Sequence, residues 1–146
     1  MSVLGTDESA RSAAKHSFDC HTARVTTQWP DENVGIITVQ GELDASNATQ
    51  FADHVERCAT EGVRLILDLS PLDFFGTAGF SALHTINVRC AHAGSRWALV
   101  SGDSVSRLLR VCDRDHVLPV ANSVPEAITL LDGEPRRLLQ LVSEPS

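Results

Sequence analysis

Apolar and polar positions follow two periods along the chain, and the change of period separates strands from helices. Residues 18–29 carry many β-branched side chains that alternate with polar neighbours, which predicts a half-buried strand. A second strand is predicted over residues 34–41, VGIITVQG, and the PDEN between the two predicts a turn. Two strands joined by so short a turn predict an antiparallel hairpin.

The spacing then changes to that of a helix. Residues 48–59 bring apolar side chains to one helical face. Ser46 or Asn47 is the candidate N-cap, and Gln50, three residues after Asn47, completes a capping-box pattern. Gly62 is the predicted C-terminal stop of this helix.

Residues 63–75, VRLILDLSPLDFF, are too continuously apolar for an edge strand and predict a central strand covered on both faces, with Phe74 and Phe75 at its buried end. The remaining elements alternate between helix and strand. They are a helix at 78–93 that ends at Gly94, a strand at 96–102, a helix at 104–115, an edge strand at 117–122 and a helix at 123–132 capped by Ser123. The order ββαβαβαβα predicts an α/β fold: an N-terminal hairpin, then a mostly parallel sheet with crossover helices.

The predicted domain occupies residues 17–132, between an N-terminal arm at 1–16 and a C-terminal tail at 133–146. No segment is long and apolar enough to cross a bilayer, and the start lacks the apolar core of a signal peptide. We therefore expect a cytoplasmic protein. The net charge of −7 argues against nonspecific nucleic-acid binding, and it suits either solubility or a basic protein partner.

Four cysteines, at positions 20, 58, 90 and 112, form no CxxC and no zinc-ligand spacing with the histidines. We expect them to be buried, reduced thiols, with Cys112 facing inward from its helix; control by a redox-active pair is the alternative. The sequence has no GxSxG, GxxxxGK[ST], HExxH or complete GxGxxG. It therefore predicts a protein that is not an enzyme and needs neither metal nor cofactor.

Two loops remain as candidate sites: Gly41-Glu42-Leu43-Asp44 and Gly76-Thr77-Ala78-Gly79. Each follows a predicted strand, and the carboxyl ends of neighbouring parallel strands are where α/β sheets usually carry function. Thr77 has two interpretations. Its hydroxyl suits a helix N-cap, and a phosphate on it would also suit the positive end of a helix.

The paired motifs VQGELDASNATQF and LILDLSPLDFFGTAGFSAL resemble the STAS domain, in particular that of bacterial anti-sigma factor antagonists. The resemblance covers roughly residues 18–132. It implies a small mixed sheet with helices largely on one face, and a protein-binding activity. Such an antagonist binds an anti-sigma factor that is also a Ser/Thr kinase, frees the sigma factor, is phosphorylated by the kinase and is reset by a phosphatase.

Carried onto this chain, the resemblance places the phosphoacceptor at Thr77. It implies a docking face around that residue, made of Glu42, Asp44, Gly76, Thr77, Ala78, Gly79 and Phe80. The family usually has an acid before the acceptor and a second hydroxyl after it, where this chain has Gly76 and Ala78. An unphosphorylated STAS scaffold, or a sensor of a nucleotide or lipid, is therefore the alternative function.

Overall fold

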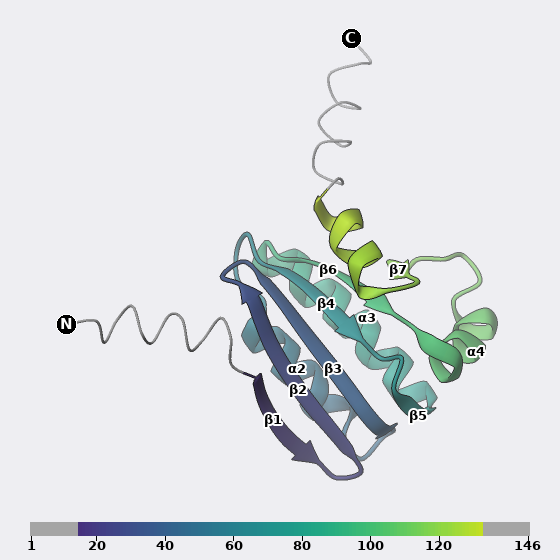
Figure 1. Cartoon of the computed structure of the whole chain (residues 1–146). Coiled ribbons are helices and arrows are strands. Elements are labelled where there is room, and N and C mark those ends of the chain that lie inside the picture. The colour runs from purple at the N-terminus through teal and green to yellow at the C-terminus, as the bar shows by residue number, and fades with distance from the viewer. Residues whose placement is uncertain (1–14, 133–146) are drawn as a thin grey trace.

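The computed structural model describes residues 15–132, so the predicted tail at 133–146 and most of the predicted arm lie outside the described residues (Figure 1). The strands are β1 (Lys15–Cys20), β2 (Ala23–Asp31), β3 (Val34–Leu43), β4 (Arg64–Asp68), β5 (Leu72–Phe75), β6 (Arg96–Val100) and β7 (Val120–Ala121). The helices are α2 (Ala48–Cys58), α3 (Thr77–Ala93) and α4 (Gly102–Cys112), and residues 124–132 are helical as well.

The strands form one mixed sheet in the order β1-β2-β3-β4-β6-β7, with β5 paired to the far end of β3. β1, β2 and β3 pair antiparallel, whereas β4, β5, β6 and β7 join the sheet in parallel. The predicted α/β architecture, with its N-terminal antiparallel part and its crossover helices, is confirmed. β7 lies at the sheet edge, as the sequence predicted, and Pro119, which has no N–H to donate, directly precedes it.

The predicted single strand over residues 18–29 is wrong, because the chain turns back at His21 and Thr22. β1 begins at Lys15, two residues before the expected domain boundary, and pairs with β2 up to Cys20 opposite Ala23. His21 adopts a φ of 57°, a conformation that turns usually give to glycine or asparagine. No glycine therefore marks this turn in the sequence.

The predicted strand over residues 63–75 is also interrupted. The N–H of Leu72 donates to the carbonyl of Leu69 at 3.1 Å, so the chain turns after β4 and re-enters the sheet as β5 beside β3. Leu65, Ile66 and Leu67 of β4 are all fully buried, as a central strand requires.

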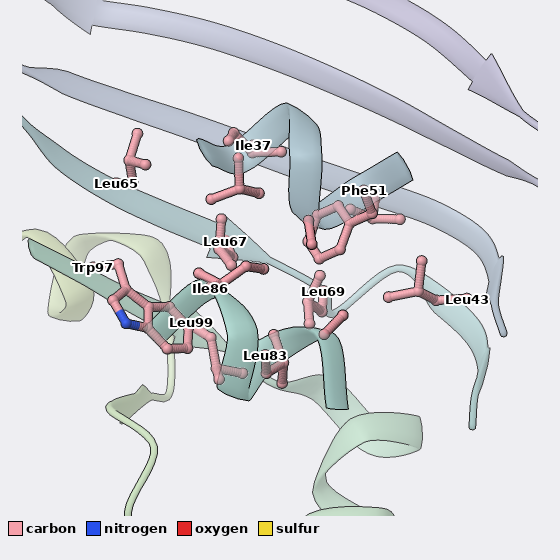
Figure 2. Packing of buried hydrophobic residues seen from close by; sticks show 14 of the residues in the cluster. Ile37, Leu43, Phe51, Leu65, Leu67, Leu69, Leu83, Ile86, Trp97 and Leu99 are labelled. Carbon is pink, nitrogen blue, oxygen red and sulfur yellow. The ribbon is translucent and has the colours of Figure 1, made fainter. Parts of the chain in front are cut away.

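Most of the helices cover one face of the sheet (Figure 1). α2 and α3 lie there side by side, and Figure 2 shows Phe51, Leu83 and Ile86 meeting Ile37, Leu67 and Leu99 of the sheet. Each such side chain contributes about 1.5–3 kcal/mol by leaving water. A smaller cluster joins Ile66 and Ala98 to Ala127 and Leu131 of the helical residues 124–132, so the two clusters lie on opposite faces of the sheet.

The ends of the helices agree only in part with the prediction. α3 ends at Gly94, which has the expected left-handed φ of 75°. α2 ends at Cys58 with Ala59 as its C-cap, because Gly62 (φ 82°) serves the following turn and not the helix. None of the helices within residues 15–132 is both long and apolar enough to span a bilayer.

The four cysteines are free thiols, but burial separates them. Cys20 and Cys90 are buried as expected, Cys58 is half-buried, and Cys112 is exposed, which corrects its predicted inward position. Burial first, and then the charge of Glu56, raise the pKa of Cys90 to about 11. In the part of the chain that the structure describes, no group of three His, Cys, Asp or Glu side chains could hold a metal ion.

Candidate functional site

The two candidate loops meet through the backbone. β3 and β5 pair in parallel at their carboxyl ends, with Glu42 opposite Phe74 and Leu43 opposite Phe75. The N–H of Gly76 then donates to the carbonyl of Leu43 at 3.1 Å. Asp44 follows Leu43 and Thr77 follows Gly76, so the two loops begin side by side. Their predicted juxtaposition is confirmed.

Asp44 is half-buried, and its carboxylate is held by the next turn of the chain. Its Oδ1 accepts hydrogen bonds from the hydroxyl of Ser46 at 2.6 Å and from the N–H of Ser46 at 2.9 Å. The hydroxyl bond first, then the backbone bond, lower the pKa of Asp44 below its ordinary value, with a smaller effect from His21. The site therefore presents a fixed negative charge at neutral pH, beside the exposed Glu42.

Asn47 is the side chain that holds this loop in place, and it is almost fully buried (1% exposed). Its amide nitrogen donates to the carbonyls of Cys20 at 3.0 Å and Glu42 at 2.9 Å, and its Oδ1 accepts the N–H of Asp44 at 3.0 Å. Asn47 occupies the N-cap position of α2 but makes no side-chain cap bond, so the predicted capping box is wrong. Gln50 instead accepts the Cys20 thiol.

Thr77 is the first residue of α3, and Gly76 occupies the N-cap position without a side-chain bond. The interpretation of Thr77 as the cap is therefore wrong. Its side chain is exposed, and its hydroxyl has no hydrogen-bond partner among residues 15–132. The first N–H groups of a helix have no acceptor within the helix and carry its partial positive charge, so the hydroxyl stands free at an electropositive end.

Gly79 has a packing reason to be a glycine. It is buried, and a Cβ on it would lie 2.5 Å from Cε1 of Phe75, whose ring fills the space beneath the first turn of α3. Phe74 has the opposite role: it was predicted to be buried, but 49% of it is exposed. Successive strand residues face opposite sides, and Phe75 enters the main core. Phe74 points to the other face and takes no part in the smaller cluster around Ile66 and Ala98, so its predicted burial is wrong.

Phe74 also lies over Gly76. A Cβ on Gly76 would be 3.2 Å from Cε2 of the Phe74 ring, so the ring borders the place where an acidic side chain would begin. Three residues after Thr77, Phe80 is half-buried and meets the His84 ring edge-on, at 4.6 Å between ring centroids. Along the chain, one aromatic residue therefore precedes Thr77 by three positions and another follows it by three.

A shallow groove leads away from the loops between α2 and α3. It begins beside the exposed Ala45 and the half-buried Ala78, which are small residues at the two loops. At its far end Arg89 of α3 binds Asp53 and Glu56 of α2 at 3.0 and 2.9 Å. The small side chains keep the two helices' outer surface hollow next to the site.

The family model described as the STAS domain matches residues 30–127. Osmosensory protein A of Mycobacterium tuberculosis is 37% identical over 73% of this chain and 70% of its own length. Anti-sigma-F factor antagonist RsfA of the same species is 34% identical over 73% of this chain and 85% of its own.

Among solved structures, an anti-sigma factor antagonist from Mycobacterium paratuberculosis superposes with a TM-score of 0.60 at 19% identity. The superposition covers 80% of this chain and 91% of that one. At this low sequence identity, the likeness shows a shared fold and nothing about function. The sequence motifs, the match of the family model and the fold agree. The chain belongs to the STAS domain family.

Proposed function

We propose that this protein is a cytosolic anti-sigma factor antagonist. It binds an anti-sigma factor of the Ser/Thr kinase type, which frees the sigma factor, and phosphorylation of Thr77 by that kinase ends the binding. A phosphatase would return it to the active form. The observation that carries the proposal is the backbone pairing of the two loops, which brings the loop of Asp44, a fixed carboxylate, beside the exposed Thr77, whose hydroxyl has no hydrogen-bond partner among residues 15–132. The name of the relative RsfA supports the antagonist role.

The surface around Thr77 has the composition of a protein-binding face. The exposed Phe74 and the half-buried Phe80, three residues before and three after Thr77, supply aromatic area, and aromatic side chains carry much of the energy of protein interfaces. Glu42 and Asp44 supply negative charge next to them. We therefore expect the partner to bring an apolar contact for Phe74 and basic side chains for the two carboxylates.

A phosphate on Thr77 would affect the partner far more than the domain. Among the residues that the structure describes the hydroxyl has no hydrogen-bond partner, and the adjacent helix N-terminus favours an anion, so the fold should tolerate the group. In the complex, the same group would bring roughly −1.5 to −2 charges close to Glu42 and Asp44, in a place that must lose its water on binding. The phosphorylated antagonist should therefore leave its partner.

The first experiment tests the acceptor. The full-length protein and its Thr77→Ala variant are incubated with ATP and the Ser/Thr kinase-type anti-sigma factors of the same organism, and intact masses are measured. One phosphate on the wild type and none on Thr77→Ala is the expected result. Thr77→Ala should unfold at the same urea concentration as the wild type, because it loses no hydrogen bond. A protein that takes no phosphate on any residue would contradict the switch and favour the unphosphorylated scaffold or ligand sensor.

The second experiment tests the docking face. Thr77→Glu should weaken binding to the anti-sigma factor about tenfold or more in calorimetry. Thr129→Glu is the matched control: it adds the same charge at an exposed threonine of the helical residues 124–132, on the opposite face of the sheet, and should bind normally. Phe74→Ala should also weaken binding. If Thr77→Glu binds like Thr129→Glu, the docking face lies elsewhere.

A further inference from the structure

β1 is an open edge of the sheet. Its only strand partner in the part of the chain that the structure describes is β2, and residues 15–19 are all exposed. An unpaired edge strand offers a row of N–H and C=O groups to another strand. Phe18 on this edge is 36% exposed, although its ring packs edge-on against His54 of α2 at 5.0 Å between centroids.

The hairpin between β1 and β2 shows which backbone groups are available. Cys20 and Ala23 close a two-residue turn, so they form a hydrogen-bonded pair, and such pairs alternate along an antiparallel ladder. Phe18 and His16 therefore direct their backbone bonds toward β2. Lys15, Ser17 and Asp19 direct theirs outward, to the open edge.

The same alternation divides the side chains. Ser17 bonds Thr26 at 2.9 Å and Asp19 pairs with Arg24 at 2.9 Å, so Lys15, Ser17 and Asp19 share the sheet face away from α2. His16 and Phe18 lie on the face that carries α2, as the contact between Phe18 and His54 shows.

The sequence KHSFD at residues 15–19 is complementary to itself when run antiparallel. With a twofold axis through Ser17, the outward groups of Lys15 meet those of Asp19 in the second copy, and Ser17 meets Ser17. Both charge pairs are then attractive, and His16 faces the exposed ring of Phe18 twice. Opposite charges and aromatic rings directly across a strand pair stabilise it.

We propose that β1 is a self-association surface, on which β1 of a second copy of this chain pairs antiparallel about Ser17, so that the two sheets become one. About six backbone hydrogen bonds form across the axis, two for each of the three outward pairs. A hollow beside Phe18, lined by Gln50, Asp53 and Arg57, leaves room on the α2 side for the incoming His16.

Other registers lose this complementarity. The backbone groups allow only register shifts of two residues, because a shift of one would leave the outward groups out of phase. Each allowed shift moves the twofold axis by one residue. With the axis at His16, Lys15 lies opposite Ser17, and with the axis at Phe18, Lys15 lies opposite His21, where the turn has begun. Only the register centred on Ser17 places both charges opposite a partner of opposite sign.

Charge exchange in the full-length protein tests the surface and its register together. Lys15→Glu sets a glutamate against Asp19 in both pairs, and Asp19→Lys sets two lysines against each other in both pairs. Each variant alone should dimerise about tenfold or more weakly than the wild type in sedimentation velocity. An equal mixture should form a heterodimer of wild-type strength. One of its pairs joins the two introduced side chains, which have opposite charges, and the other joins the native Lys15 and Asp19.

The mixture also controls for side effects of the substitutions. Asp19→Lys loses the exposed pair with Arg24, a surface pair of small energy, but this loss is the same alone and in the mixture. Circular dichroism should show all three proteins folded. The proposal is overturned by a wild type that stays monomeric at roughly millimolar concentration, which would leave the edge to residues 1–14 or to another protein. Variants that dimerise normally, or a mixture that fails to recover, would overturn it too.

Discussion

Replacing Asn47 by alanine is the most direct test of how the site is built. The amide of Asn47 makes three hydrogen bonds to backbone groups of three segments: Cys20 at the end of β1, Glu42 in β3, and Asp44 in the loop. Asn47 itself is 1% exposed; its bond to Cys20 is buried, and its bonds to Glu42 and Asp44 are partly buried. Alanine fills none of these roles.

The expected loss follows from those bonds. Each hydrogen bond contributes about 1 kcal/mol net, and each buried group left without a partner costs about 1–3 kcal/mol. The carbonyl of Glu42 retains a long bond from the Thr22 hydroxyl at 3.4 Å, so the loss of stability should lie at the lower end of the sum of these contributions. Asn47→Ala should therefore reduce the free energy of unfolding by about 3–4 kcal/mol, and the melting temperature by about 10 °C.

Urea unfolding followed by circular dichroism measures this loss, with Ser46→Ala as the control. Ser46 is the exposed neighbour whose hydroxyl bonds only Asp44 among the described residues, so its removal should change stability by less than about 0.5 kcal/mol. If Asn47→Ala is as stable as Ser46→Ala, the three bonds do not hold the loop. Within the proposed function, Asn47→Ala should also weaken partner binding, because the position of Asp44 depends on it.

Three further predictions concern the rest of the fold. Gly41→Ala should destabilise the protein by about 3 kcal/mol or more in urea unfolding, because φ is 94° there and the new Cβ would overlap the Thr22 carbonyl oxygen. Burial first, and then the charge of Arg57, lower the pKa of His54 from 6.5, so the unfolded chain binds this proton more readily. Stability should therefore fall as the pH drops below 6.5, and His54→Gln should flatten that part of the pH profile. The exposed Cys112 should be the first thiol to react with Ellman's reagent at about pH 8, and Cys112→Ser should remove that fast phase. The buried thiols should react only when the protein unfolds.

The sequence predicted those features that depend on periodicity and on topology. The buried stripe of α3, with Leu83 and Ile86, follows from helical spacing, and its end follows from Gly94. The meeting of the Asp44 and Thr77 loops follows from a rule about parallel strands, and that rule needs no knowledge of side-chain contacts.

The failures have a common cause in residues whose partners are distant in the sequence. The turn at His21 carries no glycine, and the turn before Leu72 is hidden in an apolar run, where Ser70 and Pro71 were its only signal. Asn47 has the spacing of a capping box, yet its amide bonds the end of β1 and the loop after β3. Tertiary hydrogen bonds decided its role, and local spacing could not show them.

The different roles of Asn47 and Thr77 bear on how such a site could switch. A buried amide and the backbone of Gly76 make structural bonds of the site, while the Thr77 hydroxyl bonds no other residue within 15–132. A modification of Thr77 therefore changes the surface without weakening the core. Gly76 bears on the same question. It has no side chain, and the exposed ring of Phe74 lies where a Cβ would begin. This chain therefore has an apolar ring beside Thr77, where the family's usual pattern has an acid. A kinase that recognises this site would have to contact the Phe74 ring and the Asp44 loop. Phe74→Ala should therefore slow phosphorylation of Thr77 as well as weaken partner binding.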